Sequence, residues 1–142
     1  MLVSQILKHK GDMVFTAAPG DSVAAVAALL HARKVGAMVV MGEDRQVAGI
    51  VSERDIVRIV AEQGAAGLDH PVSACMTCDV VFAEPDETVD ALMARMTDRR
   101  IRHLPVCTEG RLVGIVSIGD LVKSKIAETT AEAETLKAYI AA

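Results

Sequence analysis

A nine-residue phrase occurs twice in this chain, sixty-five positions apart. Gly49–Val57 reads GIVSERDIV and Gly114–Val122 reads GIVSIGDLV, and six of the nine positions are identical. A serine and, three residues later, an aspartate stand in both copies. A repeat of this length restricts the chain to folds built from two similar units, because each copy must find a similar local environment.

The similarity extends well beyond the phrase. Pro19–Val26 (PGDSVAAV) parallels Pro85–Leu92 (PDETVDAL), and Val3–Leu7 (VSQIL) parallels Val72–Met76 (VSACM). Segments of matching character therefore precede the phrase in both halves, in the same order. Two complete copies of one folding unit are expected.

Between the copies, residues 63–71 (QGAAGLDHP) are rich in Gly and Ala and show no periodicity, which is typical of a linker. We therefore expect one domain over residues 1–65 and a second over residues 66–128. Residues 129–142 form a helical tail, which either extends the last helix or starts another.

Hydrophobic spacing predicts the elements of each unit. Apolar residues at helical spacing indicate helices, short apolar runs indicate buried strands, and the serine of each phrase opens a helix. The expected elements of the first unit are a strand at Met13–Thr16, a helix at Asp21–Lys34, strands at Gly36–Met41 and Val47–Val51, and a helix at Glu53–Gln63. Those of the second are a strand at Val80–Phe82, a helix at Asp86–Asp98, strands at His103–Cys107 and Arg111–Val116, and a helix at Ile118–Glu128. The predicted fold class is mixed α/β (α+β), with the order β-α-β-β-α written twice.

Composition excludes several classes of protein. Hydrophobic residues make up 51% of the chain and aromatic residues 2%, so the core must be aliphatic. No apolar run approaches the roughly 18 residues of a membrane span, and the N-terminus lacks the layout of a secretory leader. A cytoplasmic protein without membrane contact is expected. The net charge of −4 disfavours binding to nucleic acid, which needs excess basic charge.

The repeated Ser-x-x-Asp, which is Ser52 with Asp55 and Ser117 with Asp120, has two interpretations. The first is a helix cap, in which the serine hydroxyl accepts a hydrogen bond from the first turn and the carboxylate faces the positive helix end. The usual capping box has Glu or Gln at the fourth position, whereas both copies have Asp. The preceding Gly-Ile-Val is also kept, so the whole corner between strand and helix is repeated.

The second interpretation is a ligand site. The N-terminus of a helix offers free N–H groups and partial positive charge, which suit a phosphate. A carboxylate at the same place can accept two hydrogen bonds from a ribose diol, as in dinucleotide-binding folds. Serine and aspartate at a helix N-terminus therefore indicate a site for a nucleoside phosphate.

The doubled Gly-Ile-Val-Ser-x-x-Asp, each copy preceded by a helix and a turn, resembles the cystathionine-β-synthase (CBS) domain pair, or Bateman module. The resemblance covers roughly residues 1–128. It implies two domains packed sheet to sheet about a pseudo-twofold axis, with clefts between them for AMP, ADP, ATP, NAD-type dinucleotides or S-adenosylmethionine. It also implies that Ser52, Asp55, Ser117 and Asp120 hold ribose and phosphate.

The resemblance makes the two sites unequal. Arg102 and His103 match family positions whose basic residues reach ligand phosphates, whereas the first copy has Gly36 and Ala37 there. The alternative is that the arginines from Arg99 to Arg102 form an exposed helix end. The adenine pocket implied by the resemblance is lined by Met76, Thr77, Ala37 and Pro105, with Lys8 in place of threonine in the first copy.

Cys75 and Cys78 have the spacing of a redox or zinc motif. A redox CxxC lies at the start of a helix in a βαβ unit, whereas this one precedes a predicted strand. A zinc site needs two further ligands, and only His70, His103 and Cys107 are available. We interpret Cys75 as a small core residue and expect no metal. The four histidines are scattered, and no nucleophile with a base can be named.

The sequence therefore predicts a non-catalytic sensor that binds an adenine nucleotide, forms a homodimer and acts on a separate, unidentified protein by a ligand-dependent shift in conformation. Three alternatives remain open. One is a purely structural dimerisation module with empty clefts, and another is an oxidoreductase that uses the CxxC. The third is a nucleic-acid role for the arginines from Arg95 to Arg102, which the charge and the scarcity of stacking aromatics disfavour.

Overall fold

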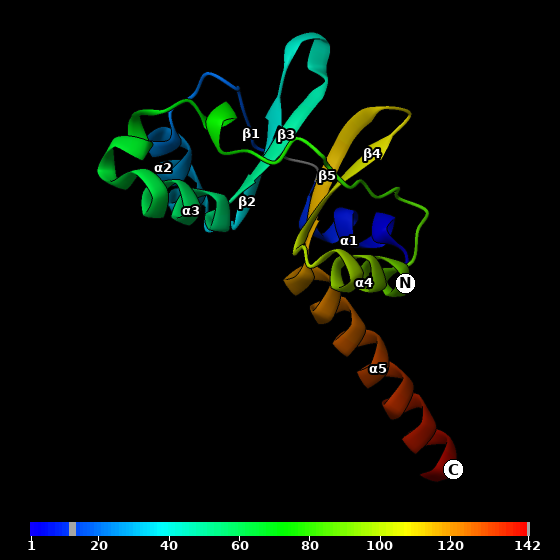
Figure 1. Cartoon of the computed structure of the whole chain (residues 1–142). Helices are drawn as coiled ribbons and strands as arrows, with labels where there is room; N and C mark the ends of the chain where they lie inside the picture. The colour runs from blue at the N-terminus through cyan, green and yellow to red at the C-terminus, as the bar shows by residue number, and fades with distance from the viewer. Residues whose placement is uncertain (12–13, 142) are drawn as a thin grey trace. The chain divides into compact units, whose positions relative to one another are not determined.

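The chain forms two compact units in the computed structural model, which describes residues 1–11 and 14–141. Unit 1 joins Met1–Met13 to Phe82–Ala142, and unit 2 is Val14–Val81. Each unit combines a small sheet with helices (Figure 1). The mixed α/β fold class predicted from the sequence is confirmed.

Unit 2 holds a three-stranded sheet in the order β1-β2-β3, in which β1 is parallel and β3 antiparallel to the central β2. Its elements are β1 (Thr16–Ala17), α2 (Val23–Arg33), β2 (Ala37–Met41), β3 (Val47–Ser52) and α3 (Glu53–Gln63), with 3₁₀ turns η1 (Glu43–Arg45), η2 (Gly64–Asp69) and η3 (Val72–Ala74). Of the strand expected at Met13–Thr16, Met13 lies outside the described residues, and β1 begins at Thr16.

Unit 1 holds the antiparallel hairpin β4-β5 and three helices. Its elements are α1 (Val3–Lys10), α4 (Val89–Arg99), β4 (His103–Thr108), β5 (Arg111–Ser117) and α5 (Ile118–Ala141). The strand expected at Val80–Phe82 is wrong, because the chain pairs with β4 only at Ala83, through Ala83 N–H to Pro105 O at 2.9 Å and Cys107 N–H to Ala83 O at 2.9 Å. The tail is a continuation of the last helix, as one of the two expectations had it.

The helices α2 of unit 2 and α4 of unit 1 begin and end in the same way. Ser22 Oγ accepts from Ala25 N–H at 3.0 Å before α2, and Thr88 Oγ1 accepts from Ala91 N–H at 3.1 Å before α4. Both helices therefore start two or three residues later than hydrophobic spacing alone indicates. Both end on a left-handed residue, Lys34 at φ 55° and Arg100 at φ 54°.

Each unit is completed by a segment that precedes the other sequence repeat. Val3 N–H donates to Glu87 O at 3.0 Å in unit 1, and Val72 N–H donates to Asp21 O at 2.7 Å in unit 2. Residues before the first repeat thus fold with the second repeat, and those before the second fold with the first. The boundaries 1–65 and 66–128 follow the repeat in the sequence, whereas the compact units divide the chain differently.

The core of each unit is aliphatic, as the composition indicates. Unit 2 buries residues of α2, β2 and β3 together with Ile59 of α3 and Val72. In unit 1, Leu92, Met96, Leu104 and Leu121 are almost completely buried. Among the described residues, no helix is both long and apolar enough to cross a membrane.

Candidate functional site

The first corner, where β3 meets α3, is a closed hydrogen-bonded cap. Asp55 Oδ2 accepts from Ser52 N–H at 2.9 Å and from the Ser52 hydroxyl at 3.2 Å, while Ser52 Oγ accepts from Asp55 N–H at 3.4 Å. Asp55 Oδ1 lies 3.1 Å from Arg58 Nη1. The Asp55 side chain is only 8% exposed. Both carboxylate oxygens are therefore occupied by groups of the protein, and this corner is built as a helix cap.

The second corner, where β5 meets α5, repeats the cap but leaves it more open. Ser117 N–H donates to Asp120 Oδ2 at 2.9 Å, and Asp120 N–H donates to Ser117 Oγ at 3.1 Å. The Asp120 side chain is 28% exposed. The hydrogen bonds that Ser117 N–H and Lys10 Nζ donate to this carboxylate both go to Oδ2, and the Ser117 hydroxyl also lies within hydrogen-bond reach of the carboxylate. Neither of these two N–H donors thus occupies Asp120 Oδ1.

A lysine from α1 completes the second corner. Lys10 Nζ donates to Asp120 Oδ2 at 2.7 Å and to Ile115 O at 2.9 Å. Burial by itself raises the pKa of the Asp120 carboxyl, but the hydrogen bonds from Lys10 and Ser117 outweigh it, so the pKa lies below its usual value. Asp120 is therefore held ionised beside an ammonium group.

The start of the preceding strand lies beside each corner. Ala37 pairs with Ser52 across β2 and β3, and His103 pairs with Ser117 across β4 and β5. Ile118 N–H donates to Arg102 O at 2.8 Å. The structure therefore places Arg102, which is exposed, and His103, which is half-buried, at the second corner together with Ser117.

Arg99 and Arg100 differ from Arg102 in their local setting. Arg99 lies in the last turn of α4, and Arg100 is the left-handed C-cap residue whose N–H donates to Thr97 O at 3.3 Å. Cations at these positions face the negative end of the helix. The helix-end interpretation thus fits Arg99 and Arg100, whereas Arg102 lies next to the first residue of β4.

Met76 and Thr77, expected in the adenine pocket, lie with the first corner. Thr77 exchanges two backbone hydrogen bonds with Ile50 of β3, at 2.8 and 3.0 Å, and Arg58 Nη2 donates to Cys75 O at 2.9 Å. Ala37 belongs to the same unit. Pro105 lies in β4 of unit 1 and is buried. The four residues thus divide between the units, and their contact with adenine stays a prediction.

The repeated glycine of the phrase has a structural reason. A Cβ on Gly49 would lie 2.8 Å from Thr77 O and 2.9 Å from Met76 Sδ, and a Cβ on Gly114 would lie 2.5 Å from Leu7 Cδ2. Real Cβ atoms do not approach other atoms so closely. In each unit, the segment that precedes the other repeat thus packs directly on this glycine. In both copies of the phrase, the glycine allows this close packing, and the serine and aspartate form the helix cap.

The cysteines are free thiols in the described residues. Cys75 is 3% exposed and belongs to the core of unit 2, as expected, whereas Cys78 is exposed. Burial, followed by the nearby Asp55 charge, raises the pKa of the Cys75 thiol, which makes it unreactive. Over residues 1–11 and 14–141, no group of three or more His, Cys, Asp or Glu side chains could hold a metal ion.

Two cations at the corners were missed by sequence reasoning. Arg58 lies three residues after Asp55 on a correctly predicted helix, so its pairing follows from helical spacing. Lys10 is 110 positions away from Asp120, and no local pattern connects the two residues. Only the exchange of N-terminal segments between the repeats brings Lys10 to its corner.

Comparisons with known proteins agree with this architecture. The CBS domain family model matches the chain twice, at residues 4–62 and 72–126. The CBS domain-containing protein CBSX3, mitochondrial, of Arabidopsis thaliana is 34% identical over 146 residues, which cover 97% of this chain and 71% of that protein. The crystal structure of the CBS-domain containing protein ATU1752 from Agrobacterium tumefaciens is 48% identical with a TM-score of 0.85, covering 87% of this chain and 92% of that one.

Two further similar structures contain adenine compounds. The CBS domain protein PAE2072 from Pyrobaculum aerophilum, complexed with AMP, is 28% identical with a TM-score of 0.75 over 84% of this chain and 89% of that one. The CBS domain pair of protein MJ0100, in complex with 5′-methylthioadenosine and S-adenosyl-L-methionine, is 26% identical with a TM-score of 0.80 over 90% and 98%. With two matched segments that cover most of its length, the chain belongs to the CBS domain family and contains two CBS domains.

Proposed function

We propose that this protein is a non-catalytic sensor that binds an anionic adenine nucleotide, such as AMP, ADP, ATP or NAD, at the second corner. The observation that carries the proposal is the open half of that corner. Asp120 Oδ1 can accept a ribose hydroxyl, and the Ser117 hydroxyl, which lies beside the Asp120 carboxylate, can rotate to donate to ribose or phosphate. Adenine compounds in PAE2072 and MJ0100 support this class of ligand.

The charge around the second corner favours a phosphate-bearing ligand. Unit 1 supplies two basic side chains here, Lys10 and Arg102, and the N-terminus of α5 adds partial positive charge. Arginine can hold a phosphate with two hydrogen bonds. Adenosine, which has no phosphate, and S-adenosylmethionine, whose sulfonium is positive, should bind there more weakly than AMP.

Bound ligand would act by shifting the population of conformations toward the one that binds it better. A separate regulated protein then detects that conformation. A homodimer fits the exposed apolar side chains of α3 and α5, which are Val57 at 66%, Val60 at 37%, Val122 at 38% and Ile126 at 62% exposure. Ile59 and Leu121 of the same helices are buried within their own units and are not available for such contacts.

A structural dimerisation module is the second candidate. It is favoured by the capping hydrogen bonds, since both aspartates already serve their own helices. Thermal shift and isothermal titration with AMP, ADP, ATP, NAD, S-adenosylmethionine and adenosine separate the two candidates. A sensor is stabilised by at least one phosphate-bearing compound, whereas a module that binds nothing keeps the same melting temperature with all six.

A further inference from the structure

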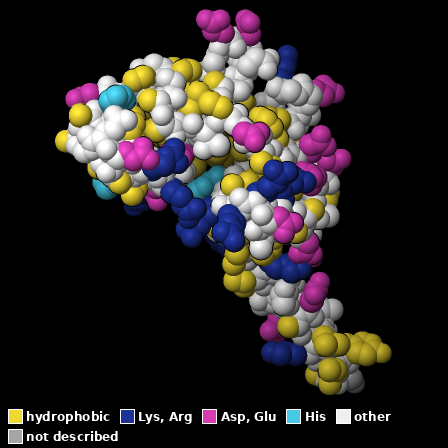
Figure 2. Space-filling view, in the orientation of Figure 1, with side chains coloured by type: hydrophobic (Ala, Val, Ile, Leu, Met, Phe, Trp, Pro, Cys, Tyr) yellow, Lys and Arg dark blue, Asp and Glu magenta, His cyan; other side chains and the backbone are white. Residues whose placement is uncertain are grey.

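The C-terminal part of α5, residues 129–141, extends away from the rest of unit 1 (Figure 1). Every described residue from 129 to 141 is exposed. Figure 2 shows hydrophobic side chains gathered at this end of the helix, where Leu136, Tyr139 and Ile140 are 59%, 81% and 74% exposed. A lone helix of about 12–15 residues is only marginally stable in water. Apolar side chains on such a helix indicate a surface that another helix covers.

Six exposed positions of α5, five of them apolar, follow a heptad repeat. Alternate steps of four and three residues connect six positions, called here the α5 seam: Val122, Ile126, Thr129, Ala133, Leu136 and Ile140. This spacing is that of a coiled coil. All six seam positions are exposed, so a partner helix can reach the seam along its whole length.

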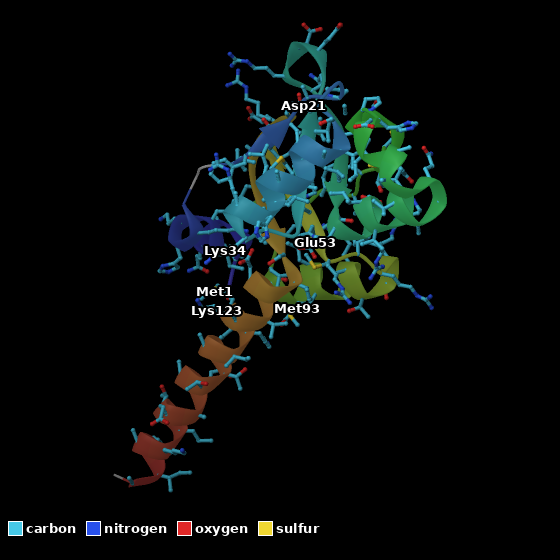
Figure 3. The ribbon with its side chains drawn as sticks, turned by 90° about the vertical axis from the view of Figure 1, so that its left-hand side faces the viewer. Met1, Asp21, Lys34, Glu53, Met93 and Lys123 are labelled. Atoms are coloured by element: carbon cyan, nitrogen blue, oxygen red, sulfur yellow. The ribbon has the colours of Figure 1, made fainter. Side chains whose placement is uncertain are left out.

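The side of α5 that unit 1 covers is a different one. Leu121 is fully buried, and Ser124 Oγ donates to Met1 Sδ at 2.6 Å. Figure 3 shows Met1 beside the first turns of α5, near Lys123. Val122 and Ile126, which begin the seam, remain 38% and 62% exposed although they lie in these same turns. The seam therefore starts in the turns of α5 that pack on the rest of unit 1 and continues into the projecting part.

We propose that the α5 seam pairs with the α5 seam of a second copy of this chain, as a parallel two-stranded coiled coil. In heptad terms, Ile126, Ala133 and Ile140 occupy a positions, and Val122, Thr129 and Leu136 occupy d positions. Isoleucine at a with leucine at d favours two parallel strands. The pairing would bury Leu136 and Ile140 of both copies, which nothing else in unit 1 covers.

Charge complementarity selects the parallel orientation. Glu132 stands at a g position and Lys137 at the following e position, so a parallel pair brings Glu132 of each helix beside Lys137 of the other. An antiparallel pair that buries Ile126 against Leu136 would place Lys123 beside Lys137, and would place the two copies of Glu132 near each other. Like charges at such positions are unfavourable.

A membrane surface fits the helix less well than a second copy. Interfacial amphipathic helices are rich in Lys and Arg on their polar face. The projecting part of α5 instead carries Glu132 and Glu134, which an anionic lipid surface repels, and a single lysine, Lys137. Liposomes of anionic lipid should therefore leave the protein in solution.

Analytical ultracentrifugation of the full chain tests the pairing. Leu136→Glu puts a charge into the seam. Ala138→Glu puts the same charge two residues further along, on the opposite side of the helix. We expect Leu136→Glu to weaken the dimer at least about tenfold and Ala138→Glu to leave it unchanged. A wild-type monomer, or equal dimer dissociation constants for both variants, would overturn the proposal.

Disulfide cross-linking tests the orientation of the two helices. It also distinguishes a dimer held by the α5 seam from a dimer held by the exposed apolar residues of α3 and the first turns of α5. Under mild oxidation, Ile140→Cys should give a covalent dimer, because residue 140 meets itself only in a parallel pair. Ala138→Cys is the matched control, and the wild-type chain gives the background from its three native thiols. No excess of cross-linked dimer for Ile140→Cys over Ala138→Cys contradicts the proposal.

Charge exchange adds a third readout that does not depend on ligand binding. Glu132→Lys should weaken the dimer, because it places two lysines side by side at each flank of the seam. Adding Lys137→Glu to the same chain restores opposite charges and should restore the dimer. If the double variant is as weak as Glu132→Lys alone, the parallel g–e pairing is wrong.

Discussion

Lys10 Nζ lies 2.7 Å from Asp120 Oδ2, although 110 positions separate the two residues in the chain. In the first corner the equivalent carboxylate, Asp55, pairs instead with Arg58 on its own helix. Two nearly identical phrases therefore neutralise their aspartates by different means. The Asp55 carboxylate is buried with partners on both oxygens, whereas the Asp120 carboxylate is more exposed, and the described residues donate to its Oδ2.

The two aspartates should contribute unequally to stability in the absence of ligand. Asp55→Asn removes the charge from a buried carboxylate that accepts hydrogen bonds and pairs with Arg58, and it should cost about 1–3 kcal/mol. Asp120→Asn breaks a partly exposed pair and should cost less than about 1 kcal/mol. Urea denaturation of both variants measures the difference. A larger loss for Asp120→Asn would show that the second corner is the more important cap.

Arg102 should contribute to affinity through the phosphate alone. Arg102→Ala is expected to weaken AMP about tenfold or more, since it removes a charge-assisted contact, while any binding of adenosine stays nearly unchanged. Arg99→Ala is the matched control, because Arg99 lies in the last turn of α4. Competition against a fluorescent AMP analogue gives both affinities. Equal losses of AMP affinity from the two variants would mean that Arg102, like Arg99, only forms part of an exposed helix end.

The lowered pKa of Asp120 predicts a stability change in acid. A carboxyl whose pKa is lower in the folded chain stabilises the fold above its unfolded pKa of about 3.9, and loses that contribution as the pH falls through the folded value. The melting temperature of the wild type should therefore exceed that of Asp120→Asn near pH 6, and the difference should shrink below about pH 4.

Glu87 is a second carboxylate whose pKa is lowered in the folded chain, and it is present in both the wild type and Asp120→Asn. The hydrogen bond from Arg95 lowers the pKa of Glu87, and burial opposes it. Since both chains keep this pair, its effect cancels in the difference. A difference between wild type and Asp120→Asn that stays constant from pH 6 to pH 3 would show that the charge of Asp120 does not stabilise the fold.

The two repeated glycines should respond differently to alanine. Gly49→Ala brings a methyl group against a backbone oxygen, Thr77 O, and is expected to cost about 1–3 kcal/mol, as overpacking does. Gly114→Ala meets the end of the Leu7 side chain, which can change its rotamer, so the cost should be smaller. Thermal unfolding compares them. The reverse order would mean that the Leu7 contact is the more rigid one.

Most of the fold could be predicted because the signals are local. The spacing of apolar residues gave α2 to α5 and β2 to β5, and Glu53–Gln63 was predicted with its observed bounds. The helix α1 was not predicted, since its eight residues depend on distant backbone acceptors at Pro85 and Glu87. The wrong strand at Val80–Phe82 has the same origin, because strand pairing is decided by a partner elsewhere in the chain.

The local parts of the candidate site could also be predicted from the sequence, whereas its contacts between distant residues could not. Each phrase forms the corner that its sequence indicates, and the strand pairing brings His103 beside Ser117. The sequence alone could not show that Asp55 is buried and saturated while Asp120 keeps an open oxygen. In the first corner Arg58 pairs with Asp55 Oδ1, whereas in the second corner Lys10, which arrives only through the tertiary fold, donates to Asp120 Oδ2.

The most direct test of the account is isothermal titration of AMP into the wild type, Asp120→Asn and Asp55→Asn. We predict one strong site per chain in the wild type, and a loss of roughly ten- to a hundredfold in affinity for Asp120→Asn, as expected for one charge-assisted hydrogen bond. Asp55→Asn should bind AMP with nearly the wild-type affinity. No binding of AMP to the wild type, or equal affinities for all three proteins, would contradict a nucleotide site at the second corner.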